Sequence, residues 1–302
     1  MRLSVIVVTR NRPHMLVACL DSIAVALVEA APLAAEIVVV DNGSTDHTAR
    51  AILDWTGTHS VPVRHLVEPR QGRARALNLA CQAAAGELLA FTDDDCRLDA
   101  GYILDLQRHD AADEGLVLRG GRVELGDPTD LPFTINIGEA RLRWGRALNS
   151  ARSQSLIGRI MGCNMTMRRD LYKRVGPFDE RFGPGSRVGS GDDADYVFRA
   201  YLAGVTLEYV PDMVMRHFHG RKTPADARAL LRRYMVGSGA LYAKHVLRDP
   251  DLCRPLAWDL KNFVKDFATG KNTCLPELGF SHADKVASMA RGAFRYLMMK
   301  RI

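Results

Sequence analysis

The sequence has 302 residues, of which 47% are hydrophobic and 25% charged, a composition typical of a soluble globular protein. No apolar stretch approaches the ~20 residues of a membrane span, and the apolar run at residues 3–8 is too short for the core of a signal peptide. These features exclude an integral membrane protein and predict a cytoplasmic location. Six cysteines occur singly, without a CxxC pair, which favours reduced thiols over a disulfide framework or a zinc site.

The net charge of +6 is unevenly distributed along the chain. Residues 216–302 contain 17 Lys and Arg against 7 Asp and Glu, a local charge of +10, and the rest of the chain carries −4. A basic tail on an acidic body indicates contact with an anionic partner, such as a membrane surface or a phosphorylated acceptor. Helices with solvated basic faces would explain the same charge, so both interpretations stay open. We expect no nucleic-acid partner.

Strand and helix patterns alternate through the first hundred residues. The expected strands are 3–8, 36–40, 63–67 and a fourth that starts at residue 88, and the expected helices between them are 14–26, 47–55 and 74–85. Most of these strands are apolar on both faces, as in a buried parallel sheet. The alternation therefore predicts βαβ units with right-handed crossovers.

Three consecutive carboxylates, Asp93, Asp94 and Asp95, follow the fourth strand. Such neighbours repel one another by roughly 1 kcal/mol per pair in water, and by more where they are desolvated. We therefore expect a positive group beside them. An Asp-x-Asp pattern at the end of a strand suits a hard divalent cation with oxygen ligands. A solvated acidic turn is the alternative interpretation.

The polar loops of this half should meet at one edge of the sheet. Because the carboxyl ends of parallel strands share an edge, Thr9, Asp41, Arg73 and the three aspartates are expected around one crevice. Asp41 could accept hydrogen bonds from a base or a ribose, and Arg73 could neutralise phosphate. Neither a P-loop nor a GxGxxG motif follows the first strand, which argues against an NAD-binding Rossmann domain.

After Cys96 the pattern changes. We expect helices at 99–110, 170–175 and 192–203, and strands at 116–125, 158–169 and 205–210, followed by the segment 213–219; the second of these helices is short and the first of these strands has a glycine irregularity. Residues 137–156 have no clear pattern, and a mobile helix is one interpretation. The glycine-rich stretch 183–191 could be a lid or a flexible loop.

Six motifs then occur in a recognisable order. They are VIVVTRNRP at 5–13, VVDNGSTD at 39–46, GRARALN at 72–78, FTDDD at 91–95, GCNM at 162–165 and GDDAD at 191–195. Each is weak alone, but the ordered set resembles the family 2 glycosyltransferases, nucleotide-sugar-dependent enzymes with the GT-A fold. The resemblance covers residues 1 to about 220, and the tail beyond residue 224 carries no motif.

The resemblance implies an α/β fold of GT-A type, with a Rossmann-like, mostly parallel sheet and flanking helices, followed by a mainly helical, basic C-terminal extension. It divides the chain into a nucleotide-sugar-binding half at 1–98, an acceptor-binding half of the same catalytic domain at 99–222, and the extension at 223–302. Helical periodicity in the extension recurs at 225–246, 257–267 and 286–299. These helices could lie on an anionic membrane, pack on the catalytic body or form a homodimer interface.

The resemblance also implies roles for individual residues. The nucleotide would be bound by Thr9, Asn11, Asp41, Asn42, Arg73, Asp93 and Asp94. Mn²⁺ or Mg²⁺ would be bound by Asp95 and His217, with His219 as a rival ligand. Asp193 would be the general base, and Cys163, Asn164 and Asp192 would lie on the acceptor or sugar side. Asp192 and Asp193 are also ordinary residues for a helix N-terminus, and a lone histidine is more often structural.

These roles predict an inverting, metal-dependent transfer of a sugar from a nucleoside diphosphate to a hydroxyl of a glycan or lipid-linked acceptor, in the synthesis of a cell-surface polysaccharide or glycolipid. A nucleotidyltransferase that makes nucleotide-sugars is the first alternative, although that class usually has a glycine-rich loop where residues 9–13 have no glycine. A non-catalytic nucleotide- or sugar-binding module is the second. The cytoplasmic enzyme could be peripheral on the inner face of the membrane.

Overall fold

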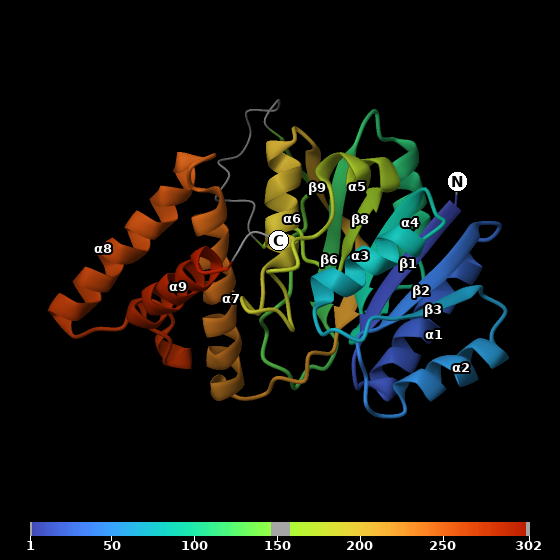
Figure 1. Ribbon diagram of the computed structural model, residues 1–302, viewed down its shortest axis with the longest axis horizontal. Coiled ribbons are helices and arrows are strands. Elements are labelled where there is room, and N and C mark those ends of the chain that lie inside the picture. The colour runs from blue at the N-terminus through green and yellow to red at the C-terminus, as the bar shows by residue number, and fades with distance from the viewer. Residues whose placement is uncertain (1, 146–157, 300–302) are drawn as a thin grey trace.

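The computed structural model describes residues 2–145 and 158–299 (Figure 1). Within these residues nine strands form one sheet in the order β3-β2-β1-β4-β8-β6-β9-β5, and β7 also pairs with β9. The strands are β1 (Arg2–Thr9), β2 (Ala34–Asp41), β3 (Val63–Val67), β4 (Leu88–Asp93), β5 (Cys96–Leu98), β6 (Val117–Leu125), β7 (Leu142–Trp144), β8 (Met165–Arg168) and β9 (Thr206–His217). The helices around the sheet are α1 (Pro13–Glu29), α2 (Thr48–Thr58), α3 (Arg73–Ala83), α4 (Tyr102–Ala111), α5 (Arg169–Val175) and α6 (Asp192–Leu202).

The first half of the sheet is parallel and buried on both faces. In β1, Val5 and Val7 belong to the core under α1, α2 and α4, whereas Ile6 between them belongs to the core under α3, α5 and α6. Successive side chains of a strand point to opposite faces, so a strand covered on both sides needs apolar residues throughout. The predicted α/β architecture and its four leading strands are confirmed.

The second half of the sheet is mixed. Strand β8 runs antiparallel to both of its neighbours, β4 and β6, and β5 and β7 run antiparallel to β9. The expected irregularity in β6 is confirmed, because its register with β9 shifts between Gly121 and Arg122. A Cβ atom on Gly121 would lie 2.1 Å from the carbonyl oxygen of Met213, so only glycine permits this approach.

Three segments of this half differ from what the sequence led us to expect. The helix suggested for 137–156 is absent where the structure describes that segment, since Leu142–Trp144 form β7; residues 146–157 lie outside the described residues. The strand expected at 158–169 is only Met165–Arg168, because residues 158–164 turn toward the pocket described below. The three-residue strand Cys96–Leu98 was not expected, since so short a run has no visible period.

The C-terminal region is helical, as predicted. It contains α7 (Pro224–His245), η3 (Pro250–Leu252), α8 (Cys253–Thr269), η4 (Pro276–Leu278) and α9 (His282–Leu297). These helices lie at the end of the molecule farthest from β3 (Figure 1). A capping box between Thr223 and Asp226, with Pro224 at the first helical position, starts α7. Among the described residues, no helix combines the length and the hydropathy that crossing a bilayer requires.

Helix α7 joins the extension to the catalytic body. Phe182 and Phe198 of the body share a buried cluster with Val236 and Leu241 of α7. On its other side α7 packs closely on α9: a Cβ atom on Gly239 would lie 1.9 Å from the carbonyl oxygen of Met289, and one on Gly292 would lie equally close to that of Val236. These two glycines therefore let the backbones of α7 and α9 touch.

A buried ion cluster strengthens the junction between α6 and α7. Asp195 has no exposed surface, and it accepts hydrogen bonds from Arg199 of its own helix and from Lys244 and His245 of α7. Burial alone would raise the pKa of Asp195, but His245, Lys244 and Arg199 outweigh it and hold that pKa well below its usual range. The third acid of the GDDAD motif, Asp195, thus anchors the extension.

Candidate active site

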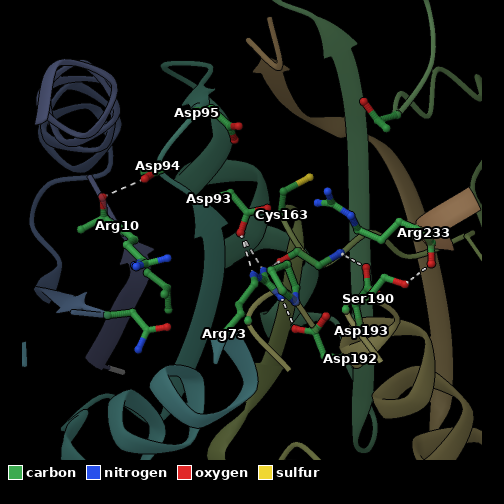
Figure 2. A pocket seen from close by; sticks show the side chains of 18 of the residues that line it. Arg10, Arg73, Asp93, Asp94, Asp95, Cys163, Ser190, Asp192, Asp193 and Arg233 are labelled. Atoms are coloured by element: carbon green, nitrogen blue, oxygen red, sulfur yellow. Dashed lines mark hydrogen bonds and ion pairs between the residues drawn. The ribbon is translucent and has the colours of Figure 1, made fainter. Parts of the chain in front are cut away.

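A cavity of about 440 Å³ lies at the carboxyl ends of β1 and β4, between the N-terminus of α6 and one side of α7 (Figure 2). Most of the site residues expected from the sequence line it: Thr9, Asn11, Asn42, Arg73, Asp93, Asp94, Asp95, Cys163, Asp192, Asp193 and His217. The structure therefore brings the aspartates that follow β4 and the aspartates that begin α6 to one cavity, although about a hundred residues separate them in sequence.

Two of the expected site residues do not line the cavity. Asp41 is 4% exposed, and its Oδ1 accepts a hydrogen bond of 2.8 Å from the backbone of Ser44. Asn164 is fully buried; its amide donates to two backbone carbonyls and its oxygen accepts a bond from the Tyr102 hydroxyl. Each side chain stabilises a turn or a strand junction beside the site.

Arg73, the first residue of α3, connects the two acidic groups. Its Nη2 lies 2.7 Å from Oδ1 of Asp93, and its Nη1 lies 2.7 Å from Oδ2 of Asp192. A further bond from Nη2 reaches the carbonyl of Gly162 at 3.1 Å. The planar guanidinium thus spans the end of β4 and the start of α6, an arrangement that a lysine ammonium cannot reproduce.

Asp93, Asp94 and Asp95 are called the aspartate triad below. A second arginine, Arg12, neutralises Asp94 and Asp95. Nη1 of Arg12 lies 3.1 Å from Asp94 and 2.8 Å from Asp95, and Thr9 also donates to Asp94. Burial raises the pKa of Asp94 to about 6, with Asp95 and Asp93 adding to the effect against Arg12. Burial also opposes ionisation of Asp95, but hydrogen bonds from His217 and Arg12 outweigh it and lower that pKa to about 2. The positive groups that the sequence led us to expect beside the three aspartates are therefore Arg12, Arg73 and His217.

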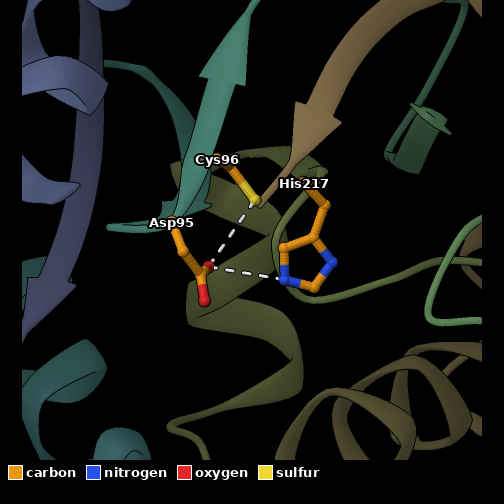
Figure 3. A group of neighbouring side chains, drawn as sticks. All are labelled: Asp95, Cys96 and His217. Carbon is orange, nitrogen blue, oxygen red and sulfur yellow. Dashed lines mark hydrogen bonds and ion pairs between the residues drawn. The ribbon is translucent and has the colours of Figure 1, made fainter. Parts of the chain in front are cut away.

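His217, rather than His219, faces the triad. Its Nε2 lies 3.4 Å from Oδ1 of Asp95, and its Nδ1 lies 3.2 Å from the carbonyl of Thr134 (Figure 3). Burial alone would lower the pKa of His217, but the contact with Asp95 raises it to about 9. The side chain of His219 is fully buried and turned to the carbonyl of Leu131, outside the cavity lining.

The groups around Asp95 fit a divalent cation. One ligand atom from each of Asp95, Cys96 and His217 lies within 4.8 Å of the others, and all three residues are buried (Figure 3). Carboxylate oxygen and imidazole nitrogen are ligands for Mn²⁺ and related metals. A cation here would have to compete with Arg12 for the oxygens of Asp95.

Asp193 lies across the cavity from the triad (Figure 2). Its Oδ2 accepts a hydrogen bond of 3.0 Å from the backbone of Gly162, and its Oδ1 accepts one from Ala194. A Cβ atom on Gly162 would come within 2.9 Å of the Asp193 Cβ, so the glycine allows α6 to approach. Burial raises the pKa of Asp193, and the neighbouring charge of Asp192 raises it further.

Sequence reasoning missed the wall that α7 contributes. Leu230, Arg233 and Tyr234 line the cavity together with Arg221, and the side chain of Arg233 points into it (Figure 2). The backbone carbonyl of Arg233 accepts a hydrogen bond from Ser190, which fixes the glycine-rich stretch against α7. Only the doublet Arg232-Arg233 could have signalled this wall, and helical periodicity alone did not show which of the two faces the site. Arg12 was also missed, although it lies in the first motif.

The profile of "Glycosyl transferase family 2" matches residues 4–176, more than half of the chain. The chain belongs to glycosyl transferase family 2. The match ends before α6, so Asp193 and the α7 wall lie beyond the segment that the family profile covers.

Two curated relatives have related sequences. Glycosyltransferase AglE of Haloferax volcanii is 28% identical over 210 residues, which are 68% of this chain and 62% of that protein. Pre-mycofactocin glycosyltransferase of Mycobacterium tuberculosis is 26% identical over 222 residues, 73% of this chain and 44% of that protein. The matched part of this chain thus spans less than two thirds of either relative.

Two solved structures share the fold. Mannosyltransferase PcManGT of Pyrobaculum calidifontis, determined with GDP-Man and Mn²⁺, has a TM-score of 0.63 and 20% identity, and the alignment covers 99% of this chain and 88% of that one. S. aureus TarS 1–349 has a TM-score of 0.57 and 19% identity, with 100% and 93% coverage. The GT-A fold expected from the sequence is therefore confirmed for this family 2 glycosyltransferase chain.

Proposed function

We propose that this chain is an inverting glycosyltransferase that requires a divalent metal and moves a sugar from a nucleoside diphosphate to a hydroxyl of a glycan or a lipid-linked acceptor. The observation that carries the proposal is the pair of separate acidic groups around one cavity. Asp95 and His217 are suited to bind a cation, and Asp193, on the opposite side of the cavity, is suited to accept a proton from the acceptor hydroxyl. This division supports transfer between two substrates better than it supports simple binding of one ligand.

The reaction needs one base near the acceptor. In an inverting displacement the acceptor oxygen forms a bond to the anomeric carbon while the bond to the diphosphate breaks, and the hydroxyl proton must leave. Asp193 is the group that takes this proton in our proposal. Its raised pKa makes it a stronger base than an ordinary carboxylate, and its hydrogen bond to Gly162 fixes its orientation.

The leaving diphosphate needs positive charge. Asp95 and His217 would hold Mn²⁺ or Mg²⁺, which supplies Lewis-acid stabilisation of the leaving group when it is bound. Arg73 keeps Asp93 and Asp192 at their separation through its two ion pairs. Thr9, Asn11 and Asn42, which also line the cavity, are proposed to contact the nucleoside. Asp41 and Asn164 are proposed to act indirectly: Asp41 stabilises the turn after β2, and Asn164 stabilises a strand junction beside the cavity.

Structures with the same fold support the choice of donor class. PcManGT was determined with GDP-Man and Mn²⁺, and TarS with UDP and with UDP-GlcNAc. From these structures we carry over to this chain only the class of donor, which is a nucleoside diphosphate sugar bound together with a divalent metal. For this chain we further propose a role in the synthesis of a cell-surface polysaccharide or glycolipid, with the enzyme in the cytoplasm.

Donor hydrolysis tests the proposal. The protein is incubated with UDP-, GDP- and dTDP-sugars with Mn²⁺, with Mg²⁺ or with EDTA, and the released nucleotide is measured. We expect a nucleoside diphosphate from at least one donor, dependent on metal and lost in Asp95→Asn. Release of pyrophosphate from a nucleoside triphosphate and a sugar phosphate would overturn the proposal in favour of a nucleotidyltransferase. Tight binding of a nucleotide-sugar without any turnover in the presence of acceptors would favour a binding module.

A further inference from the structure

Helix α8 buries its two acidic residues and exposes most of its apolar ones. Asp259 and Asp266 are 1% and 9% exposed, whereas Val264 is 58% and Phe267 84% exposed. A helix on the surface of a globular protein normally shows the opposite pattern. This inversion indicates that the outer face of α8 is built to meet something other than water.

Polar contacts fix α8 in this orientation. Lys285 of α9 donates to Asp259 at 2.7 Å, and the ring of His282 lies 3.6 Å from the same carboxylate. Asp266 accepts hydrogen bonds from the backbone and the hydroxyl of Thr273. A rotation of α8 that buried its apolar residues would break these contacts and expose both acids.

The exposed apolar residues form one stripe. Leu256, Leu260, Val264 and Phe267 are spaced by four, four and three residues, which puts them on one side of a helix.

Basic residues accompany the stripe. Arg254, Lys261 and Lys265 of α8 are exposed, while both acids of the helix are buried. Between residues 253 and 297 the chain has seven Lys and Arg against four Asp and Glu. The outward face of α8 is therefore both apolar and positive, the combination found in helices that lie in the interface of an anionic membrane.

We propose that the outer face of α8 docks on an anionic lipid bilayer. The apolar stripe enters the boundary between headgroups and acyl chains, and Lys261 and Lys265 contact the lipid phosphates. A second copy of the chain fits this face less well, because a twofold interface would bring the same bases toward each other. The proposal stands whether or not the cavity transfers a sugar, since no residue of the face lines the cavity.

Vesicle flotation with the full chain tests the proposal. We expect binding to phosphatidylcholine vesicles that contain a quarter phosphatidylglycerol, weak binding to phosphatidylcholine alone, and release at high salt. The triple variant Leu260→Ser, Val264→Ser and Phe267→Ser should lose binding by roughly tenfold or more. Its matched control is Val28→Ser with Leu53→Ser, which removes exposed apolar side chains from α1 and α2 and should bind as the wild type does. A thermal melt of each variant checks that it is folded before its binding is compared.

Charge reversal gives an independent readout. Lys261→Glu with Lys265→Glu should weaken binding to the anionic vesicles by roughly tenfold, and Lys261→Arg with Lys265→Arg should preserve it.

Three results would overturn the proposal. The first is failure of the wild type to float with anionic vesicles. The second is equal flotation of the wild type and a folded triple variant. The third is a wild-type dimer in light scattering that the triple variant dissociates, without any vesicle binding, because that result assigns the face to a second copy of the chain.

Discussion

Nη1 of Arg12 lies 2.8 Å from Oδ2 of Asp95, the carboxylate that we propose as a metal ligand. The arginine therefore competes with a cation for the same oxygen, and it also lowers the local negative potential. We predict that Arg12→Ala binds Mn²⁺ about five- to tenfold more tightly than the wild type in the absence of nucleotide, as measured by titration calorimetry. Arg10→Ala is the control, because Arg10 contacts the carbonyl of Gly43 and, among the described residues, forms no ion pair with a carboxylate. Unchanged or weaker Mn²⁺ affinity in Arg12→Ala would contradict the prediction.

The two histidines of the β9 end provide a matched pair. His217→Ala should weaken Mn²⁺ binding by at least about tenfold, because it removes the imidazole that faces Asp95. His219→Ala should leave the affinity within about twofold but lower the melting temperature, because its buried ring is hydrogen-bonded to the backbone. Calorimetry with Mn²⁺ and differential scanning fluorimetry measure the two effects. The reverse order of metal affinities would show that the ligand is His219.

Asp193 should determine the acid side of the pH profile. A general base must be deprotonated, so kcat/KM should fall as the pH drops through the pKa of Asp193. Because burial raises that pKa, the fall should begin at a higher pH than an ordinary carboxylate would give. Asp193→Asn should lower kcat about 10²- to 10⁴-fold and remove this limb, while a thermal shift with the nucleoside diphosphate persists. A variant that keeps wild-type kcat would exclude Asp193 as the base.

Asp195 should matter for stability. Its carboxylate is buried among Arg199, Lys244 and His245, so Asp195→Asn should cost about 3–5 kcal/mol of unfolding free energy at pH 7, measured in urea. Its pKa is lower in the folded state than in the unfolded state. The carboxylate therefore stabilises the fold above the unfolded pKa, near 3.9, and this contribution is lost as the pH falls below it.

The control for Asp195 is an exposed pair. Asp170 and Lys173 form an ion pair in α5 with both side chains mostly in solvent. Asp170→Asn should therefore barely change the unfolding curve. If both variants had the same small effect, the buried cluster would not be what anchors α7 to the body.

The first half of the fold was predictable because its signals are local. Strands β1 and β2 are continuous apolar runs, and each ends in polar residues that parallel geometry brings to one edge. The convergence of Thr9, Arg73 and Asp93 follows from that geometry without any knowledge of side-chain contacts.

The rest of the site depends on contacts between distant segments, which no local pattern encodes. Neither the ion pairs of Arg12 nor the inward turn of Asn164 can be read from the motifs that contain these residues. The cavity wall contributed by Arg233 and Tyr234 depends on how α7 packs against Phe182 and Phe198. The antiparallel insertion of β8 likewise needs partners from both halves of the sheet.

The packing of α7 has a practical consequence for anyone who trims this protein. Because α7 forms one wall of the cavity and its Gly239 interlocks with α9, a fragment that stops at residue 222 would be left with an open-sided cleft. Such a fragment would keep all six recognisable motifs, yet its failure to turn over substrate would say nothing about them.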